Sequence, residues 1–499
     1  MMAVGKELQP GRSAASFKCM LLCLALAWIL AAVMAAVSAA NANPDEIFHV
    51  AAGHFYLTQW LPPRVTETAL LPSISKYGFT YLSDIDATYF LAGRLASVLP
   101  ETFLNEYLRF RVFNLVLFLV LIVVYAARRD PFSAPVLMLL TPQIWYVFSY
   151  FNNDGLPLFL SLLLADTAFG SRARGAVAIS ESWRASTLIP LVGMGLLVGL
   201  LVVTKSNYLP VIAFVVFFGL WRAVGFAAAA IGVASAGIYL AQARGFVSMP
   251  TYALWACMAI GAALILVLVA TRLWRSPTSR NLMARGAIVA LAAIAVAAPP
   301  LVLDRIINGS RSEKDLVLAS IAEKHADPAY RPSDASRAGS FFGLRLRDKG
   351  LALHEILLPP WDWVGNSWKS FTGYYGYMKI HGPAAYYIAM FALYVVLLSY
   401  TTRTILLRGE AAEWQLLAVS GVFCGGVIFL SLYHSWINDF QPQGRYLFPV
   451  VALFAIPFTR ASRLFRTRVV PALVGMVFVL SVSSFLFVGL AKISKGFGP

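Results

Sequence analysis

Residues 19–40 read CMLLCLALAWILAAVMAAVSAA, an apolar run that is long enough to cross a bilayer, for which a helix needs roughly 20 residues. NPDEIFH follows at residues 43–49, so that Asp45, Glu46 and His49 come next to the expected membrane surface. Charged side chains beside lipid are costly and are usually functional. We therefore expect a membrane anchor that leads directly into a functional loop.

The composition is that of a membrane protein. Of the 499 residues, 59% are hydrophobic and only 13% are charged, and the mean hydropathy is +0.71. A soluble domain cannot bury so many apolar side chains, because most of its surface must contact water. The formal net charge of +16 does not indicate nucleic acid, since the basic residues lie in short loops between apolar runs.

Further apolar runs follow the first one along the whole chain. We expect an all-α, polytopic membrane protein of about thirteen transmembrane helices, in which residues 19–40 form an uncleaved anchor. The other expected spans are 110–126, 133–149, 156–169, 187–203, 207–221, 224–241, 251–271, 286–303, 384–402, 414–433, 446–459 and 469–490.

Alternate loops between these runs carry arginine, which is typical of the cytoplasmic side of a membrane protein. The N-terminus falls on this side as well. The arginines concerned are Arg128, Arg129, Arg172, Arg174, Arg184, Arg222, Arg272, Arg275, Arg280, Arg285, Arg403, Arg408, Arg460, Arg463, Arg466 and Arg468.

The opposite loops define the expected organisation. Residues 1–303 form an N-terminal membrane module whose first outer loop is 41–108. Residues 304–383 form an outer-face loop or lid, and residues 384–499 form the C-terminal transmembrane helices. Acids, amides, aromatic residues and isolated cations gather in these outer loops, so we expect the functional site on the non-cytoplasmic face.

Three acids in the outer loops are candidate catalytic residues. Asp45 or Glu46 can act as a general base, since a carboxylate beside an imidazole or a second acid can be poised to accept a proton. The alternative is a helix N-terminus with solvated acids. Asp154, in NNDG, is either a turn residue or a second acid. A divalent cation is possible, with Asp45, Asp154 and His49 as candidate ligands.

Lys205 and Arg445 are cations on the face that the positive-inside bias leaves poor in cations. Each lies at the end of an expected span, where a cation can simply reach towards the headgroups. The alternative is binding of a phosphate, to which arginine presents a planar fork and lysine a point charge. We expect both to bind a phosphate that is carried on a lipid.

The order of these motifs resembles that of the GT-C membrane glycosyltransferases. The resemblance covers most of the chain and rests on PDExxH at 44–49, NND at 152–154, QGRY at 443–446 and the aromatic stretch WKSFTGYYGY at 368–377. The first and third motifs are similar to those of a bacterial branch known only as predicted membrane proteins. The chain lacks the large C-terminal soluble domain of oligosaccharyltransferases.

The resemblance implies transfer of a sugar from a polyprenyl-phosphate carrier to a cell-envelope glycan or glycolipid, at the outer face of the bacterial inner membrane. It implies that Asp45 or Glu46 is the base, with inversion at the sugar carbon. It also implies that Asp154 assists or holds a metal, and that Lys205 and Arg445 bind the phosphate. The remaining candidate substrate-binding residues are His49, His54, Gln443, Tyr446, Trp368 and Tyr375.

Two other interpretations remain open. A transporter of lipid-linked sugars or other solutes would also be polytopic, but it should carry ionisable residues within its spans, of which Asp166 is the main example. A non-catalytic envelope-assembly protein would need none of the outer acids. The aromatic stretch around Trp368 and Tyr375 is consistent either with interfacial anchoring or with a lid over a sugar or lipid.

Overall fold

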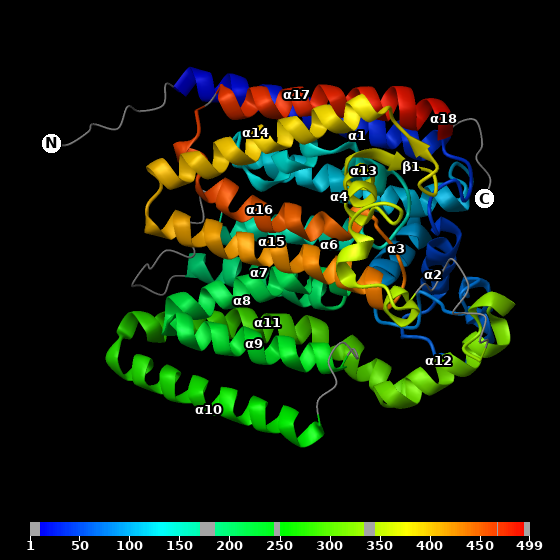
Figure 1. The fold of residues 1–499 in the computed structure, drawn as a ribbon, viewed down its shortest axis with the longest axis horizontal. Coiled ribbons are helices and arrows are strands. Elements are labelled where there is room, and N and C mark those ends of the chain that lie inside the picture. Colours follow the sequence, from blue (N-terminus) through cyan, green and yellow to red (C-terminus); the bar gives the residue numbers. More distant parts are fainter. Residues whose placement is uncertain (1–9, 170–184, 244–249, 334–344, 467, 494–499) are drawn as a thin grey trace.

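The computed structural model describes residues 10–169, 185–243, 250–333, 345–466 and 468–493, and its described regular structure is helical except for two short strands. Most helices lie side by side along one direction, which is horizontal in Figure 1. The elements are α1 (Pro10–Val37), α2 (Glu46–Thr58), α3 (Ala87–Val98), α4 (Glu106–Arg128), η2 (Ala134–Leu140), α5 (Pro142–Ser149), α6 (Gly155–Phe169), α7 (Ala185–Val202), α8 (Leu209–Val224), α9 (Phe226–Ala243), α10 (Thr251–Arg275), α11 (Pro277–Asn308), α12 (Arg311–His325), α13 (Trp363–Gly373), β1 (Tyr374–Tyr375), β2 (Ile380–His381), α14 (Ala384–Arg408), α15 (Ala411–Ile437), α16 (Phe448–Arg460), α17 (Val469–Ser484) and α18 (Ala491–Ile493).

Short helical turns connect these elements, and the two strands pair antiparallel with Tyr374 opposite His381. The turns are η1 (Thr68–Ser73), η4 (Ser206–Tyr208), η5 (Pro328–Tyr330), η7 (Leu346–Lys349), η8 (Leu353–Ile356), η9 (Gly444–Leu447), η10 (Ser462–Leu464) and η11 (Phe485–Leu490).

Eight helices in the described part of the chain are long and apolar enough to cross a membrane. Three shorter apolar helices cover 155–169, 188–202 and 226–239. The outer faces of the long helices expose large apolar side chains such as Leu266 and Ile388, which suits contact with lipid. The expected helical fold is confirmed, and the total of thirteen spans stays a prediction.

The segment 133–149 differs from the single span that the sequence predicts. It forms η2 and α5, which are separated by Thr141 in an extended conformation. Pro142 has no backbone N–H, so it starts a new helix more easily than it continues one. The Thr141 side chain accepts a hydrogen bond from the backbone N–H of Gln143. Every residue of the two helices is buried, because they occupy the centre of the bundle.

The two ends of the bundle differ in character. At one end lie α2, α3, α12, α13 and β1 (Figure 1). The other end holds the last residue of α16, Arg460, whose Nε lies 3.6 Å from Glu413 in the first turn of α15. Arg128, the last residue of α4, pairs there with Asp166 at 2.6 Å. Residues Arg172, Arg174 and Arg184 lie outside the described part of the chain.

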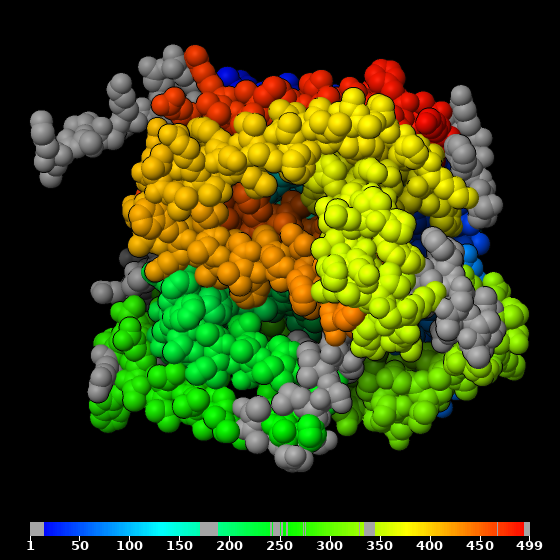
Figure 2. All heavy atoms as spheres, viewed as in Figure 1, coloured from blue at the N-terminus to red at the C-terminus, as the bar shows by residue number. Residues whose placement is uncertain are grey.

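The surface is hollowed between α14 and α15, where atoms in the colour of α16 are visible inside the recess (Figure 2). α16 packs along α15 and follows η9 directly. The floor of this hollow therefore leads towards the end of the bundle at which α2, α3 and α13 gather.

Gly444 is placed where η9 meets α13. Its backbone N–H donates a hydrogen bond to the Ser370 hydroxyl, and a Cβ at this position would overlap the backbone of Phe371. Only glycine allows this close approach, and the contact fixes the start of η9 against α13. The glycine of QGRY thus serves packing between two elements.

We predict that Gly444→Ala destabilises the protein by about 1–3 kcal/mol or more, since the methyl group forces η9 and α13 apart. Thermal unfolding of the purified protein in detergent measures the change. Gly421→Ala on α15 is the matched control, because its Cβ would meet nothing within 4 Å among the described residues. Equal unfolding temperatures for the two variants would contradict the packing argument.

Candidate functional site

Asp45 precedes α2 and has an unusual backbone conformation. Its φ of 59° lies in the left-handed region, which aspartate and asparagine tolerate better than most residues. Its carboxylate is directed at Arg445, with Oδ2 3.7 Å from Nη2. This separation is longer than a hydrogen bond, and the Asp45 side chain is 30% exposed. A ligand can therefore reach the carboxylate.

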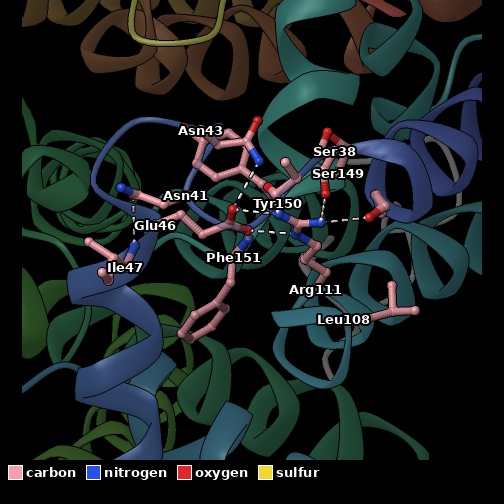
Figure 3. A network of polar contacts seen from close by, with 12 residues as sticks. Ser38, Asn41, Asn43, Glu46, Ile47, Leu108, Arg111, Ser149, Tyr150 and Phe151 are labelled. Carbon is pink, nitrogen blue, oxygen red and sulfur yellow. Dashed lines mark hydrogen bonds and ion pairs between the residues drawn. The ribbon is translucent and has the colours of Figure 1, made fainter. Parts of the chain in front are cut away.

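Glu46 has the opposite environment (Figure 3). It is fully buried, and Arg111 donates from Nε to Oε1 at 2.7 Å and from Nη2 to Oε2 at 2.6 Å. Asn43 Nδ2 donates to Oε2 at 3.0 Å, and the backbone N–H of Phe151 donates to Oε1 at 3.1 Å. Both carboxylate oxygens thus accept hydrogen bonds from the protein, so this acid is held in place.

Arg111 extends the same network to the end of α1 (Figure 3). Its Nη1 donates to the carbonyls of Ala35 and Ser38, and its Nη2 donates to that of Ala39. One buried guanidinium therefore joins α1, α2 and α4. Sequence reasoning missed this residue, although an arginine at the start of the apolar run 110–126 was a usable signal.

Asp154, Lys205 and Arg445 come from distant loops and meet beside Asp45. Lys205 Nζ donates to Asp154 Oδ1 at 2.7 Å, while Arg445 Nε lies 3.9 Å from Asp154 Oδ2. That Nε and that Oδ2 are both buried without a hydrogen-bond partner in the described part of the chain. Unsatisfied buried polar atoms are rare in folded proteins and often mark a ligand site.

The ring of Tyr446 lies close to both cations. Tyr446 lies 5.0 Å from Lys205 Nζ and 5.5 Å from the Arg445 guanidinium, measured to the ring centroid. Such contacts stabilise a cation that has lost part of its hydration. The Arg445 side chain is only 10% exposed, so its charge acts in a partly desolvated environment where it is stronger than in water.

His49 lies one turn after Asp45 and is buried. Burial, together with the nearby charges of Arg445 and Lys205, lowers the pKa of His49 well below its usual value, so the imidazole is neutral. Its Nδ1 lies 2.7 Å from the Tyr89 hydroxyl, and its ring stacks on Tyr81 at 4.1 Å. These contacts make His49 part of the wall of the site.

The remaining candidate residues lie in other surroundings. Gln443 precedes Arg445 and accepts a backbone hydrogen bond from Tyr446. His54 is mostly exposed and pairs with Glu106 at 2.6 Å.

Two of the aromatic candidates pack elsewhere in the fold. Trp368 donates to the Tyr387 carbonyl and packs against Tyr394 of α14. Tyr375 is fully buried, with its hydroxyl 3.1 Å from Ser484. The buried Tyr375 ring cannot stack on a ligand in this conformation, so it has a packing role, while Trp368 is partly buried against α14.

The candidate metal ligands do not fit a divalent cation. Within the described ranges, no group of three or more His, Cys, Asp or Glu side chains is placed to hold a metal ion. Asp45 and Asp154 both face Arg445, and His49 lies in the field of two cations. The two acids already face a protein cation, which disfavours a metal ion between them.

No family model, no curated protein and no solved structure matches this chain. The similarity to GT-C glycosyltransferases therefore stays a resemblance of short motifs. Any function has to be argued from the geometry of the residues themselves.

We predict that Arg111→Ala destabilises the protein by about 3–5 kcal/mol, because it leaves the Glu46 carboxylate buried without its partner. Chemical or thermal unfolding in detergent measures the loss. Arg311→Ala is the matched control: Arg311 pairs with Asp84, both side chains are largely exposed, and such pairs contribute about 0–1 kcal/mol. Similar stability losses in the two variants would refute the anchoring role of Arg111.

Proposed function

We propose that this chain is an inverting membrane glycosyltransferase of the GT-C type. It would move a sugar from a polyprenyl-phosphate carrier to a glycan or glycolipid acceptor of the cell envelope. The observation that carries the proposal is the Asp45 carboxylate beside Arg445, whose Nε is buried without a hydrogen-bond partner in the described structure. A base and an anion-binding group thus lie within one small space.

The two cations support phosphate as the ligand. Arg445 Nε needs an acceptor, and an arginine fork matches two phosphate oxygens. Lys205 is held beside it by Asp154, and its ammonium has further N–H groups to donate. A phosphate at this position would accept a hydrogen bond from Arg445 Nε, which the protein itself leaves unsatisfied, and this strengthens binding.

The environments of the two adjacent acids assign them different roles. Asp45 is partly exposed and makes only a long contact with Arg445, so it can take a proton from a bound hydroxyl. Glu46 is buried and occupied by Arg111, so we give it a positioning role. Asp154 orients Lys205 and balances the charge of Arg445, and we assign it to positioning as well.

In the proposed step, a hydroxyl oxygen of the acceptor attacks the anomeric carbon of the donor sugar while its proton passes to the Asp45 carboxylate. The bond between that carbon and the phosphate oxygen breaks, and its electron pair leaves with the polyprenyl phosphate. Arg445 and Lys205 stabilise the charge that develops on this oxygen. Attack opposite the leaving group inverts the sugar carbon.

The proposed setting is the bacterial inner membrane, with about thirteen spans, a cytoplasmic N-terminus and the site at the periplasmic face. The long apolar helices and the arginines at the far end of the bundle, such as Arg460, support this orientation. The hollow between α14 and α15 (Figure 2) opens between two candidate spans. We propose that it receives the polyprenyl chain.

We predict that Asp45→Asn lowers the rate of sugar transfer by about 10²–10⁴-fold, as expected for loss of a general base, and leaves carrier binding intact. The assay follows radiolabelled sugar from polyprenyl phosphate into membrane glycan. Asp84→Asn is the matched control, since Asp84 is exposed and pairs with Arg311.

The same assay separates the alternatives. Full transfer activity in Asp45→Asn contradicts the base assignment. Movement of lipid-linked sugar across the bilayer without a new glycosidic bond in the wild type would indicate a transporter. A protein that does neither would be an assembly factor.

A further inference from the structure

The stretch Tyr77-Gly78-Phe79-Thr80-Tyr81 alternates aromatic and small residues, and it covers the turn and one side of a tight hairpin. Ile74 and Thr80 form an isolated bridge, and the backbone N–H of Ser75 donates to the Phe79 carbonyl at 2.8 Å. Tyr77 and Gly78 form the turn of the hairpin, where Gly78 has a left-handed φ of 79°. The rings of Tyr77, Phe79 and Tyr81 lie next to one another beside this turn, while Thr80 is buried.

These rings join others into a continuous aromatic platform, defined here as Tyr77, Phe79, Tyr81 and Tyr330. Centroid distances are 4.8 Å from Tyr330 to Tyr77, 6.0 Å from Tyr77 to Phe79 and 5.8 Å from Phe79 to Tyr81. Tyr81 then stacks on His49 at 4.1 Å. The platform thus runs from the surface to the wall of the candidate site.

The platform is held rigidly by α12 and the turn that follows it. A Cβ on Gly78 would lie 2.7 Å from Ala322 Cα, so the hairpin and α12 are in close contact. The backbone N–H of Asp327 donates to the Lys76 carbonyl at 3.0 Å. Lys314 is buried and pairs with Asp304 at 2.8 Å, which fixes α12 to the end of α11. A rigid surface loses little entropy on binding.

The platform leads to Asp45. Burial raises the pKa of both Tyr77 and Tyr81, and among the charges that raise each further the Asp45 carboxylate is the largest. Burial and the same carboxylate raise the pKa of Tyr377 to about 12. The three phenols therefore stay protonated, and that of Tyr377 donates to Asn41 Oδ1 at 2.7 Å. Phe79 is 44% exposed, so its ring is open to a ligand.

We propose that the aromatic platform binds the acceptor, and that the acceptor presents a pyranose ring to it. This inference names the substrate class at the Asp45 end of the site and so rests on the proposed function. The apolar face of a sugar ring stacks on aromatic faces, and the phenol hydroxyls bind sugar hydroxyls. An alkyl chain would use the rings but would leave the polar groups around Asp45 unpaired, which is unfavourable.

Saturation-transfer NMR on the full chain in lipid nanodiscs tests whether the platform binds a pyranose ring. It needs neither the lipid-linked sugar donor nor sugar transfer. The probes are methyl pyranosides of glucose, galactose, mannose, rhamnose and N-acetylglucosamine, with sorbitol as an open-chain polyol of similar polarity. We expect transfer to the ring protons of one or more pyranosides and none to sorbitol. Phe79→Ala should weaken binding roughly three- to tenfold, the effect of losing one stacked ring, and Phe79→Trp should retain it.

Phe103→Ala is the matched control, because Phe103 is 86% exposed and lies outside the platform. The unfolding temperatures of all variants show whether each is folded. Absence of pyranoside binding, equal binding by Phe79→Ala and Phe103→Ala, or equal response to sorbitol overturns the inference. Displacement of the pyranoside by octanol at the Phe79 ring would also overturn the inference, because the platform would then bind an alkyl chain.

The proposed sugar transfer and the proposed pyranose binding can be disproved independently of each other. Pyranoside binding at Phe79 in a protein that shows no sugar transfer would support the platform and contradict the transferase. Sugar transfer that is unchanged in rate and acceptor affinity by Phe79→Ala would support the transferase and contradict the platform.

Discussion

The candidate site depends on the buried ion pair between Arg111 and Glu46. The guanidinium makes five hydrogen bonds, two to the carboxylate and three to carbonyls at the end of α1, so all its N–H groups are used. A buried pair is tolerated only when it is satisfied in this way. The pair fixes the chain between α1 and α2, and Asp45 in that connection is thereby held in a left-handed conformation facing Arg445.

A second set of charged side chains completes the site, and not all of its hydrogen-bonding groups have partners. Lys205, Asp154, Arg445 and Asp45 form a charge-balanced set that is mostly buried, yet Arg445 Nε and Asp154 Oδ2 lack hydrogen-bond partners among the described residues. The Arg111–Glu46 pair has all its hydrogen-bond partners and holds the fold. In the second set, Arg445 Nε can still donate a hydrogen bond to a ligand. Preorganised, partly desolvated charges of this kind are what stabilises a departing anion.

The sequence predicted the helical fold from its hydropathy, and loop charge placed four polar residues from distant loops on one face. Asp45, Asp154, Lys205 and Arg445 do meet. It could not distinguish Asp45 from Glu46, since that depends on Arg111, which is distant in sequence. It also missed the break at Thr141 and the burial of Tyr375, because tertiary packing overrides an apolar pattern and an aromatic stretch alike.

The most direct test of the central claim compares the binding of undecaprenyl phosphate and undecaprenol to the purified protein by native mass spectrometry. The two lipids differ only in the phosphate that we assign to Arg445. The account predicts that the wild type prefers the phosphate strongly and that Arg445→Gln loses this preference. Arg331→Gln should keep it, because Arg331 is exposed and donates to the Ala326 carbonyl, away from Asp154 and Lys205. Equal binding of the two lipids by the wild type, or an unchanged preference in Arg445→Gln, would contradict it.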